Sequence, residues 1–298
     1  ELKHTFTEFA QRMKNDEMIT LAKFLAISGI ILPMLPHKNL IPDINLTPYS
    51  IWLATVVVSG ISYLSYLLKR YVFHESGVLV SGIIGGLYSS TATISVLARK
   101  SRKASEQEAN EYVAAMLLAV SMMFLRFMIL ILIFSREIFT SIYPYLLIMS
   151  VVAAVVAWFI HSRHRRSKDM TDESEDEDSS NPLEFKVALI FATLFVVFTV
   201  LTHYTLVYAG TGGLNLLSFV SGLSDITPFI LNLLQNTGSV AVLVVVACSM
   251  QAIISNILVN MFYALFFAGK GSKLRPWILG GFGTVIGVNL VLLLFFYL

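Results

Sequence analysis

The chain has 298 residues, of which 56% are hydrophobic and 13% are charged, and its formal net charge is +2. Soluble domains carry about 25% charged residues, so this composition excludes an ordinary soluble globular protein. Long apolar runs indicate an all-α, multi-pass membrane protein instead. The single cysteine, Cys248, excludes an internal disulfide bond and a metal site built from several cysteines. The first residue is Glu1 rather than Met, so a further N-terminal domain is left open, and we expect no cleavable signal peptide.

The apolar segments predict about seven spanning helices, because a helix needs about 20 apolar residues to cross a bilayer. Residues 1–50 are expected to form an amphipathic lead-in at the membrane surface, followed by the first span. The expected spans lie at residues 18–35, 51–68, 113–134, 145–160, 187–208, 240–268 and 277–298.

Two further apolar segments, residues 77–98 and 212–234, are rich in Gly, Ser and Thr, and the second also contains Asp225 and Pro228. Each is either a poor spanning helix or a broken segment that re-enters the membrane, where irregular backbone is tolerated only inside protein or beside a wet cavity. Lys and Arg in short loops collect on the cytoplasmic side. With a cytoplasmic N-terminus, two re-entrant segments place nearly all loop Lys and Arg on that side, whereas two full crossings divide them about evenly. We therefore expect re-entrant segments.

The order of these segments repeats along the chain. Residues 51–160 form a predicted membrane repeat A and residues 187–298 a repeat B, and a charged cytoplasmic linker at residues 161–186 joins them. Aligning Gly86 with Gly222 brings the two Gly-rich segments into register. Each repeat crosses three times if its Gly-rich segment re-enters, so we expect two inverted repeats, which in transporters hold the substrate near the midplane. Alternatively, the small residues only let helices pack closely.

Two charged residues, Arg126 and Asp225, lie deep in apolar segments. Charges at membrane depth are costly and usually functional, so these two either form a structural pair or flank a substrate path. Asp225 is suited to carry a proton or a cation. A helix that restarts within the first Gly-rich segment would offer its free backbone N–H groups to an anion.

Hydroxyls from both Gly-rich segments and amides from the span at 240–268 complete the predicted site, although interhelical hydrogen bonds explain the amides equally well. The predicted substrate- or ion-binding residues are Ser89, Ser90, Thr91, Thr93, Arg126, Ser224, Asp225, Thr227, Gln251, Asn256 and Asn260. We expect no metal site and no cofactor, because no His pair has metal-ligand spacing and no phosphate-binding loop occurs.

Several runs resemble the C-terminal integral-membrane domain of bacterial MgtC/SapB-type proteins, a domain of unknown function. GGLYSSTAT from Gly85 with ARKSR from Ala98 is similar to its GGLxSSTAxT…AR+xR signature, and MFLR ending at Arg126 to its arginine motif. NPLEFK from Asn181, SGLSD ending at Asp225 and the Ser255-Asn256 pair match further motifs. The chain departs from the pattern at Thr227, where the family has an aspartate, and at Asn260, where it has a lysine. The resemblance implies a bacterial inner-membrane location and hints at magnesium homeostasis.

The leading hypothesis is a secondary transporter or ion-translocating protein for a small ion or solute, coupled to protons or cations. The alternative is a non-transporting membrane scaffold or regulator that binds a partner protein, with its polar residues only joining helices. An enzyme is not expected, because no nucleophile–base pair is evident. The expected partners are the lipid bilayer and a small ion or solute, with a homo-oligomer left open and no nucleic acid.

Overall fold

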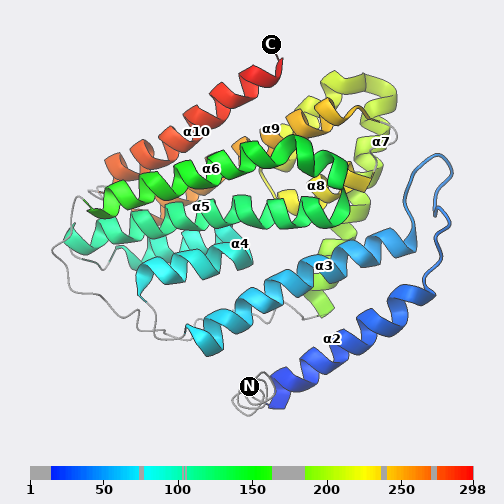
Figure 1. The fold of residues 1–298 in the computed structure, drawn as a ribbon, viewed down its shortest axis with the longest axis horizontal. Helices are drawn as coiled ribbons and strands as arrows, with labels where there is room; N and C mark the ends of the chain where they lie inside the picture. The colour runs from blue at the N-terminus through cyan, green and yellow to red at the C-terminus, as the bar shows by residue number, and fades with distance from the viewer. Residues whose placement is uncertain are drawn as a thin grey trace.

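A computed structural model describes residues 15–73, 77–102, 104, 106–162, 185–235, 240–269 and 274–297. Every regular element among these residues is helical, and the fold is a bundle of long helices (Figure 1). The predicted N-terminal lead-in and most of the predicted charged linker lie outside the described residues.

The helices follow the predicted segments closely. Eight of them are long and apolar enough to cross a membrane, which confirms the multi-pass class, and α8 is shorter. Each predicted span coincides with a helix, and the eighth candidate is α4, in the first Gly-rich segment. The elements are α2 (Asn15–Met34), α3 (Pro48–Leu67) with a π-helical turn η1 (Leu68–Val72), α4 (Val78–Lys100), α5 (Glu106–Phe134), α6 (Arg136–Ser162), α7 (Phe185–Ser221), α8 (Ile226–Gln235), α9 (Val242–Ala268) and α10 (Arg275–Tyr297).

Local capping explains why α3 begins three residues before the predicted span. Thr47 lies in extended backbone, and its Oγ1 accepts a hydrogen bond from the backbone N–H of Ser50 at 3.0 Å. The Ser50 hydroxyl accepts in return from the N–H of Thr47 at 3.1 Å. This reciprocal capping box, with Pro48 in the first turn, fixes the start of the helix.

The first Gly-rich segment, α4, is broken at Ser89, whose backbone is extended (φ −158°, ψ 106°). In a straight helix, residues eight apart lie about 12 Å apart along the axis. Here a Cβ on Gly85 would lie only 2.8 Å from Cγ2 of Thr93. The two halves of α4 therefore fold back on each other, and only a glycine at position 85 allows them to approach this closely.

The second Gly-rich segment is divided between α7 and α8. Within α7 the chain reverses at Gly210, which adopts φ 60° and ψ −153°, a conformation open mainly to glycine. A Cβ on Gly213 would therefore lie 2.8 Å from Cγ2 of Thr205. The chain then leaves the helix at residues 222–225 and restarts as α8. Both Gly-rich segments consequently contain a break between two short helical pieces.

Each of these segments packs against the long helix that follows it. Gly82 and Gly86 contact Ala115 and Ala119 of α5, so the first half of α4 runs in the same direction as α5. The second half of α7 also runs with α9, because Cys248 donates to Asn215, and Ser218 donates to Gln251.

The helices α5 and α9 run in opposite directions. Arg102, just before α5, donates hydrogen bonds to the carbonyls of Phe266 and Phe267 at the end of α9. The start of α5 thus lies beside the end of α9.

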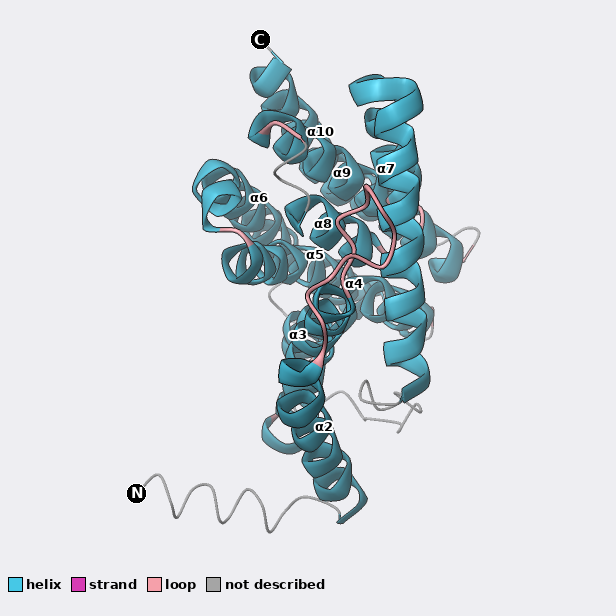
Figure 2. Cartoon of the chain, turned by 90° about the vertical axis from the view of Figure 1, so that its right-hand side faces the viewer, coloured by secondary structure: helices cyan, strands magenta, loops and turns pink. Residues whose placement is uncertain are grey.

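Helix α2 lies at the margin of the bundle, beside α3 (Figures 1 and 2). Its Glu17 is 6% exposed and accepts a hydrogen bond from the hydroxyl of Tyr66 at 2.9 Å. The same carboxylate forms a 2.9 Å ion pair with Arg70. One end of α2 is therefore tied to α3 by polar contacts, whereas most of its apolar surface is exposed.

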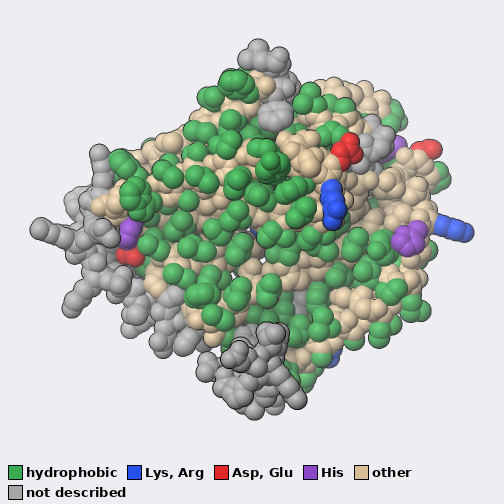
Figure 3. Space-filling model, in the orientation of Figure 1, with side chains coloured by type: hydrophobic (Ala, Val, Ile, Leu, Met, Phe, Trp, Pro, Cys, Tyr) green, Lys and Arg blue, Asp and Glu red, His purple; other side chains and the backbone are tan. Residues whose placement is uncertain are grey.

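The molecular surface fits a membrane environment. On the face shown in Figure 3, apolar side chains cover the middle, and the charged and histidine side chains lie toward its two ends. Because α5 and α6 run between these ends (Figure 1), the apolar middle is the part that contacts the hydrocarbon of the bilayer.

The close approach of α4 to α5 predicts the effect of adding one methyl group. A Cβ on Gly86 would lie 2.5 Å from Cα of Ala119, so Gly86→Ala must push backbone apart, and we expect it to destabilise the protein by about 1–3 kcal/mol. Thermal unfolding in detergent measures this. Gly283→Ala is the matched control, because a Cβ on Gly283 meets nothing within 4 Å. Equal unfolding temperatures for the two variants would contradict the packing.

A candidate binding site at the helix breaks

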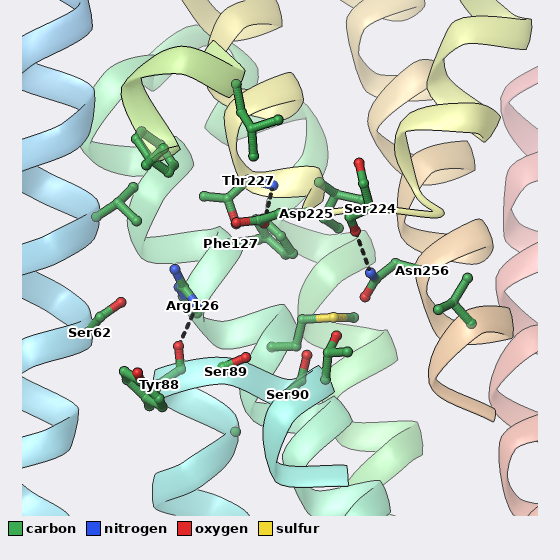
Figure 4. A pocket seen from close by; sticks show the side chains of 18 of the residues that line it. Ser62, Tyr88, Ser89, Ser90, Arg126, Phe127, Ser224, Asp225, Thr227 and Asn256 are labelled. Atoms are coloured by element: carbon green, nitrogen blue, oxygen red, sulfur yellow. Dashed lines mark hydrogen bonds between the residues drawn. The ribbon is translucent and has the colours of Figure 1, made fainter. Parts of the chain in front are cut away.

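A cavity of about 380 Å³ lies where the two helix breaks meet (Figure 4). Its walls come from the breaks in α4 and before α8, from α3, α5 and α9, and from the first part of α7. The lining residues are Val58, Ser59, Ser62, Gly86, Tyr88, Ser89, Ser90, Thr91, Met123, Arg126, Phe127, Ile190, Phe191, Leu194, Leu223, Ser224, Asp225, Ile226, Thr227, Asn256, Val259 and Tyr263.

Arg126 connects α5 to the break in α4. Its Nη1 donates a hydrogen bond of 2.8 Å to the backbone carbonyl of Tyr88, the last residue before the break (Figure 4). A helix end leaves carbonyl groups without partners in the helix, so this bond satisfies one of them at membrane depth. The buried Nε of Arg126 has no hydrogen-bond partner in the protein.

The two helical pieces that restart at the cavity are capped by their own side chains. Ser89 Oγ accepts a hydrogen bond from the N–H of Ala92 at 3.3 Å. Asp225 Oδ1 accepts one from the N–H of Thr227 at 2.9 Å (Figure 4). Side chains of this kind stabilise helix N-termini. Both N-termini, which carry partial positive charge, therefore begin beside the same cavity.

Arg126 and Asp225 both line the cavity, but they do not form an ion pair with each other. Asp225 is instead bonded to its own helix, and its side chain is exposed. The two opposite charges therefore interact across the cavity without a direct ion pair.

Asn256 holds the second break in place from α9. Its Nδ2 donates to the carbonyls of Gly222 at 3.4 Å and Ser224 at 3.5 Å. Its Oδ1 accepts a hydrogen bond of 3.2 Å from Nδ2 of Asn260, one turn further along α9. Asn260 thus fixes which way the Asn256 amide faces, so that the donor end points toward the broken backbone.

Most of the predicted site residues line this cavity. These are Ser89, Ser90, Thr91, Arg126, Ser224, Asp225, Thr227 and Asn256. The other three lie elsewhere: Thr93 packs on Gly85, Gln251 accepts from Ser218, and Asn260 lies behind Asn256.

The sequence interpretation missed four polar contributors, namely Ser59, Ser62, Tyr88 and Tyr263. Ser59 and Ser62 lie one turn apart on α3, and this spacing within an apolar span was the available signal. Among the described residues no cluster of three or more His, Cys, Asp or Glu side chains could hold a metal ion.

The Asn256 contacts predict a stability loss. Asn256→Ala removes two hydrogen bonds from a buried side chain to backbone carbonyls, and we expect the free energy of unfolding to fall by about 1–3 kcal/mol. Chemical or thermal unfolding in detergent measures this. Asn45→Ala is the control, because Asn45 donates to the Gln235 carbonyl at an exposed site where water can replace it. A loss at Asn45 as large as that at Asn256 would argue against the assigned role.

Comparisons with known proteins place the chain in a family. It is 27% identical over 221 residues to an uncharacterized protein of Aquifex aeolicus (strain VF5), covering 73% of this chain and 94% of that protein. No solved structure matches. Residues 56–268 match the family described as Domain of unknown function (DUF4010). This range runs from α3 to the end of α9 and includes every residue that lines the cavity. The chain therefore belongs to the DUF4010 family.

Proposed function

We propose that this protein is a secondary transporter or ion-translocating protein that moves a small ion or solute, coupled to protons or cations. One observation carries the proposal: two broken helices, from different halves of the chain, meet at one cavity that also holds Arg126 and Asp225. Transporters place their sites at such breaks because unwound backbone and helix ends can bind ligands at membrane depth.

The two Gly-rich segments act as re-entrant hairpins in this proposal. The reversal of α4 at Ser89 supports it, since both ends of α4 then lie on one side of the membrane. The contact of Arg102 with the end of α9 also supports it. In a topology where both segments cross fully, Arg102 and the end of α9 would lie on opposite sides.

The two halves are inverted repeats in the same proposal. Each half has a long helix, a broken hairpin and two further long helices in that order. Gly86 and Gly222 occupy equivalent places, because one packs on Ala119 of α5 and the other on Ala252 and Ser255 of α9. The opposite directions of α5 and α9 are those expected for inverted copies.

The bacterial inner membrane is the proposed location, with the N-terminus in the cytoplasm. The loop Lys and Arg residues support this orientation through the positive-inside rule. A relation to the MgtC/SapB-type proteins is proposed from the motif resemblance alone. A role in magnesium homeostasis would follow only from that relation.

Sidedness labelling tests the topology. On a Cys248→Ala background, single cysteines replace Lys69, Arg99 and Arg136, which are all exposed. If α4 re-enters, positions 69 and 99 react with an impermeant maleimide from one side of the membrane and position 136 from the other. A full crossing by α4 would put position 99 opposite position 69 and return position 136 to the side of 69.

Asp225 is the proposed coupling residue, because it is the acid that lines the cavity. We expect Asp225→Asn to abolish solute-dependent proton flux while leaving the unfolding temperature nearly unchanged, since Asn also caps helices well. The measurement uses proteoliposomes loaded with a pH-sensitive dye and given anionic, neutral and cationic small solutes in turn.

Asp43→Asn is the matched control, because Asp43 is exposed in the loop before α3 and Asn tolerates its positive φ of 65°. Full flux in Asp225→Asn would remove this residue from the mechanism. A wild-type protein that moves no solute of any class would overturn transport and favour the scaffold alternative.

A further inference from the structure

A hydrogen-bond donor of Arg126 that has no partner in the described part of the chain indicates a negatively charged ligand. A guanidinium carries five N–H groups, and the protein uses Nη1 for the Tyr88 carbonyl while the buried Nε has no partner. Among the described residues, no carboxylate forms an ion pair with this guanidinium, and Asp225 acts on it only from a distance across the cavity. A buried positive charge without a close partner is costly at membrane depth. An anion beside the guanidinium would compensate this charge.

The second half of α4 adds to the same electrostatic preference. This piece continues to Lys100 and starts beside Arg126, with Ser90 and Thr91 of its first turn lining the cavity. Its positive N-terminal end is capped only by the neutral hydroxyl of Ser89. The N-terminus of α8 differs, because the carboxylate of Asp225 occupies it. The α4 side of the cavity is therefore positive and the α8 side is neutralised.

Much of the remaining wall of the cavity is apolar, apart from the polar contributors of α3 and α9. Its apolar side chains include Val58, Phe127, Phe191, Leu194 and Val259, which come from four different helices. A hydrated inorganic ion gains nothing from such a wall, whereas an organic anion buries its apolar body there. A cavity of about 380 Å³ suits a small molecule.

We propose that the cavity binds a small organic anion, with its charged head at Arg126 and the start of the second half of α4, and its apolar body on the apolar side chains of the wall. This assignment rests on the proposed transport function and names its substrate class. A short-chain carboxylate is the simplest compound with this chemistry.

Asp225 then links the anion to a proton. The titratable or charged groups that face it across the cavity are Tyr88 from α4, Arg126 from α5 and Tyr263 from α9, whereas α3 and α7 contribute none. An ionised Asp225 repels the anion, and a protonated Asp225 leaves Arg126 as the net charge of the site. Binding of a proton therefore favours binding of the anion, so both would move in the same direction.

Ligand-induced thermal stabilisation of the full chain in detergent tests the assignment. The probes are butyrate, its neutral isostere butyramide and the cation butylammonium. We expect butyrate alone to raise the unfolding temperature, and more strongly at low pH. Arg126→Gln, which keeps an amide donor for the Tyr88 carbonyl, should weaken butyrate binding by about tenfold or more. Arg136→Gln is the control, because Arg136 is exposed at the start of α6.

Asp225→Asn gives a second reading that does not depend on the folding of the Arg126 variant. It should bind butyrate at least as tightly as wild type and lose the pH dependence. Stabilisation by butylammonium or equally by butyramide overturns the anion assignment, and so does the absence of any effect of butyrate.

The assignment and the proposed function fail separately. Butyrate binding by a protein that moves no solute in proteoliposomes, with protons or with cations, leaves the anion site in place and overturns transport. Proton flux driven by a cation keeps transport and overturns the anion.

Discussion

Unpaired backbone at membrane depth is the constraint on which this architecture depends. A helix that breaks inside the hydrocarbon region exposes N–H and C=O groups that no water can satisfy. Here the long helices supply the missing partners: Arg126 of α5 binds the carbonyl before one break, and Asn256 of α9 binds two carbonyls at the other. Ser89 and Asp225 cap the helical pieces that follow. The two halves of the chain thus satisfy the backbone groups at their breaks with different residue types.

In the Gly-rich segments, some residues pack against neighbouring helices and others line the cavity. Gly82, Gly86 and Gly222 bring backbone against α5 or α9, as the packing alternative requires. The hydroxyl and carboxylate residues beside them face the cavity instead. The glycines thus place the breaks close enough for Arg126 and Asn256 to reach them, and the polar residues beside them remain the proposed site.

Hydropathy predicted the spans well, because twenty apolar residues in a row admit few other structures. It could not locate the reversal at Gly210, since the residues on both sides remain apolar and only the backbone conformation changes. Hydropathy also gives no sign that Thr93 packs on Gly85, because the two residues meet only after α4 folds back. Thr93 was therefore included in the predicted site, although it does not line the cavity. Ser59 and Ser62 were missed because isolated serines in an apolar helix usually bond to their own backbone.

The separation of Arg126 from Asp225 supports the proposed transport function over the scaffold alternative. In a scaffold, a buried charge such as Arg126 is expected to pair directly with an opposite charge, because a buried charge without a partner is strongly destabilising. Here the carboxylate caps α8 and the guanidinium binds the Tyr88 carbonyl, while a cavity lies between the two breaks. The guanidinium of Arg126 therefore remains buried without a close carboxylate partner among the described residues, which is costly at membrane depth. A ligand that enters the cavity beside it would offset that cost, as the proposed transport function requires.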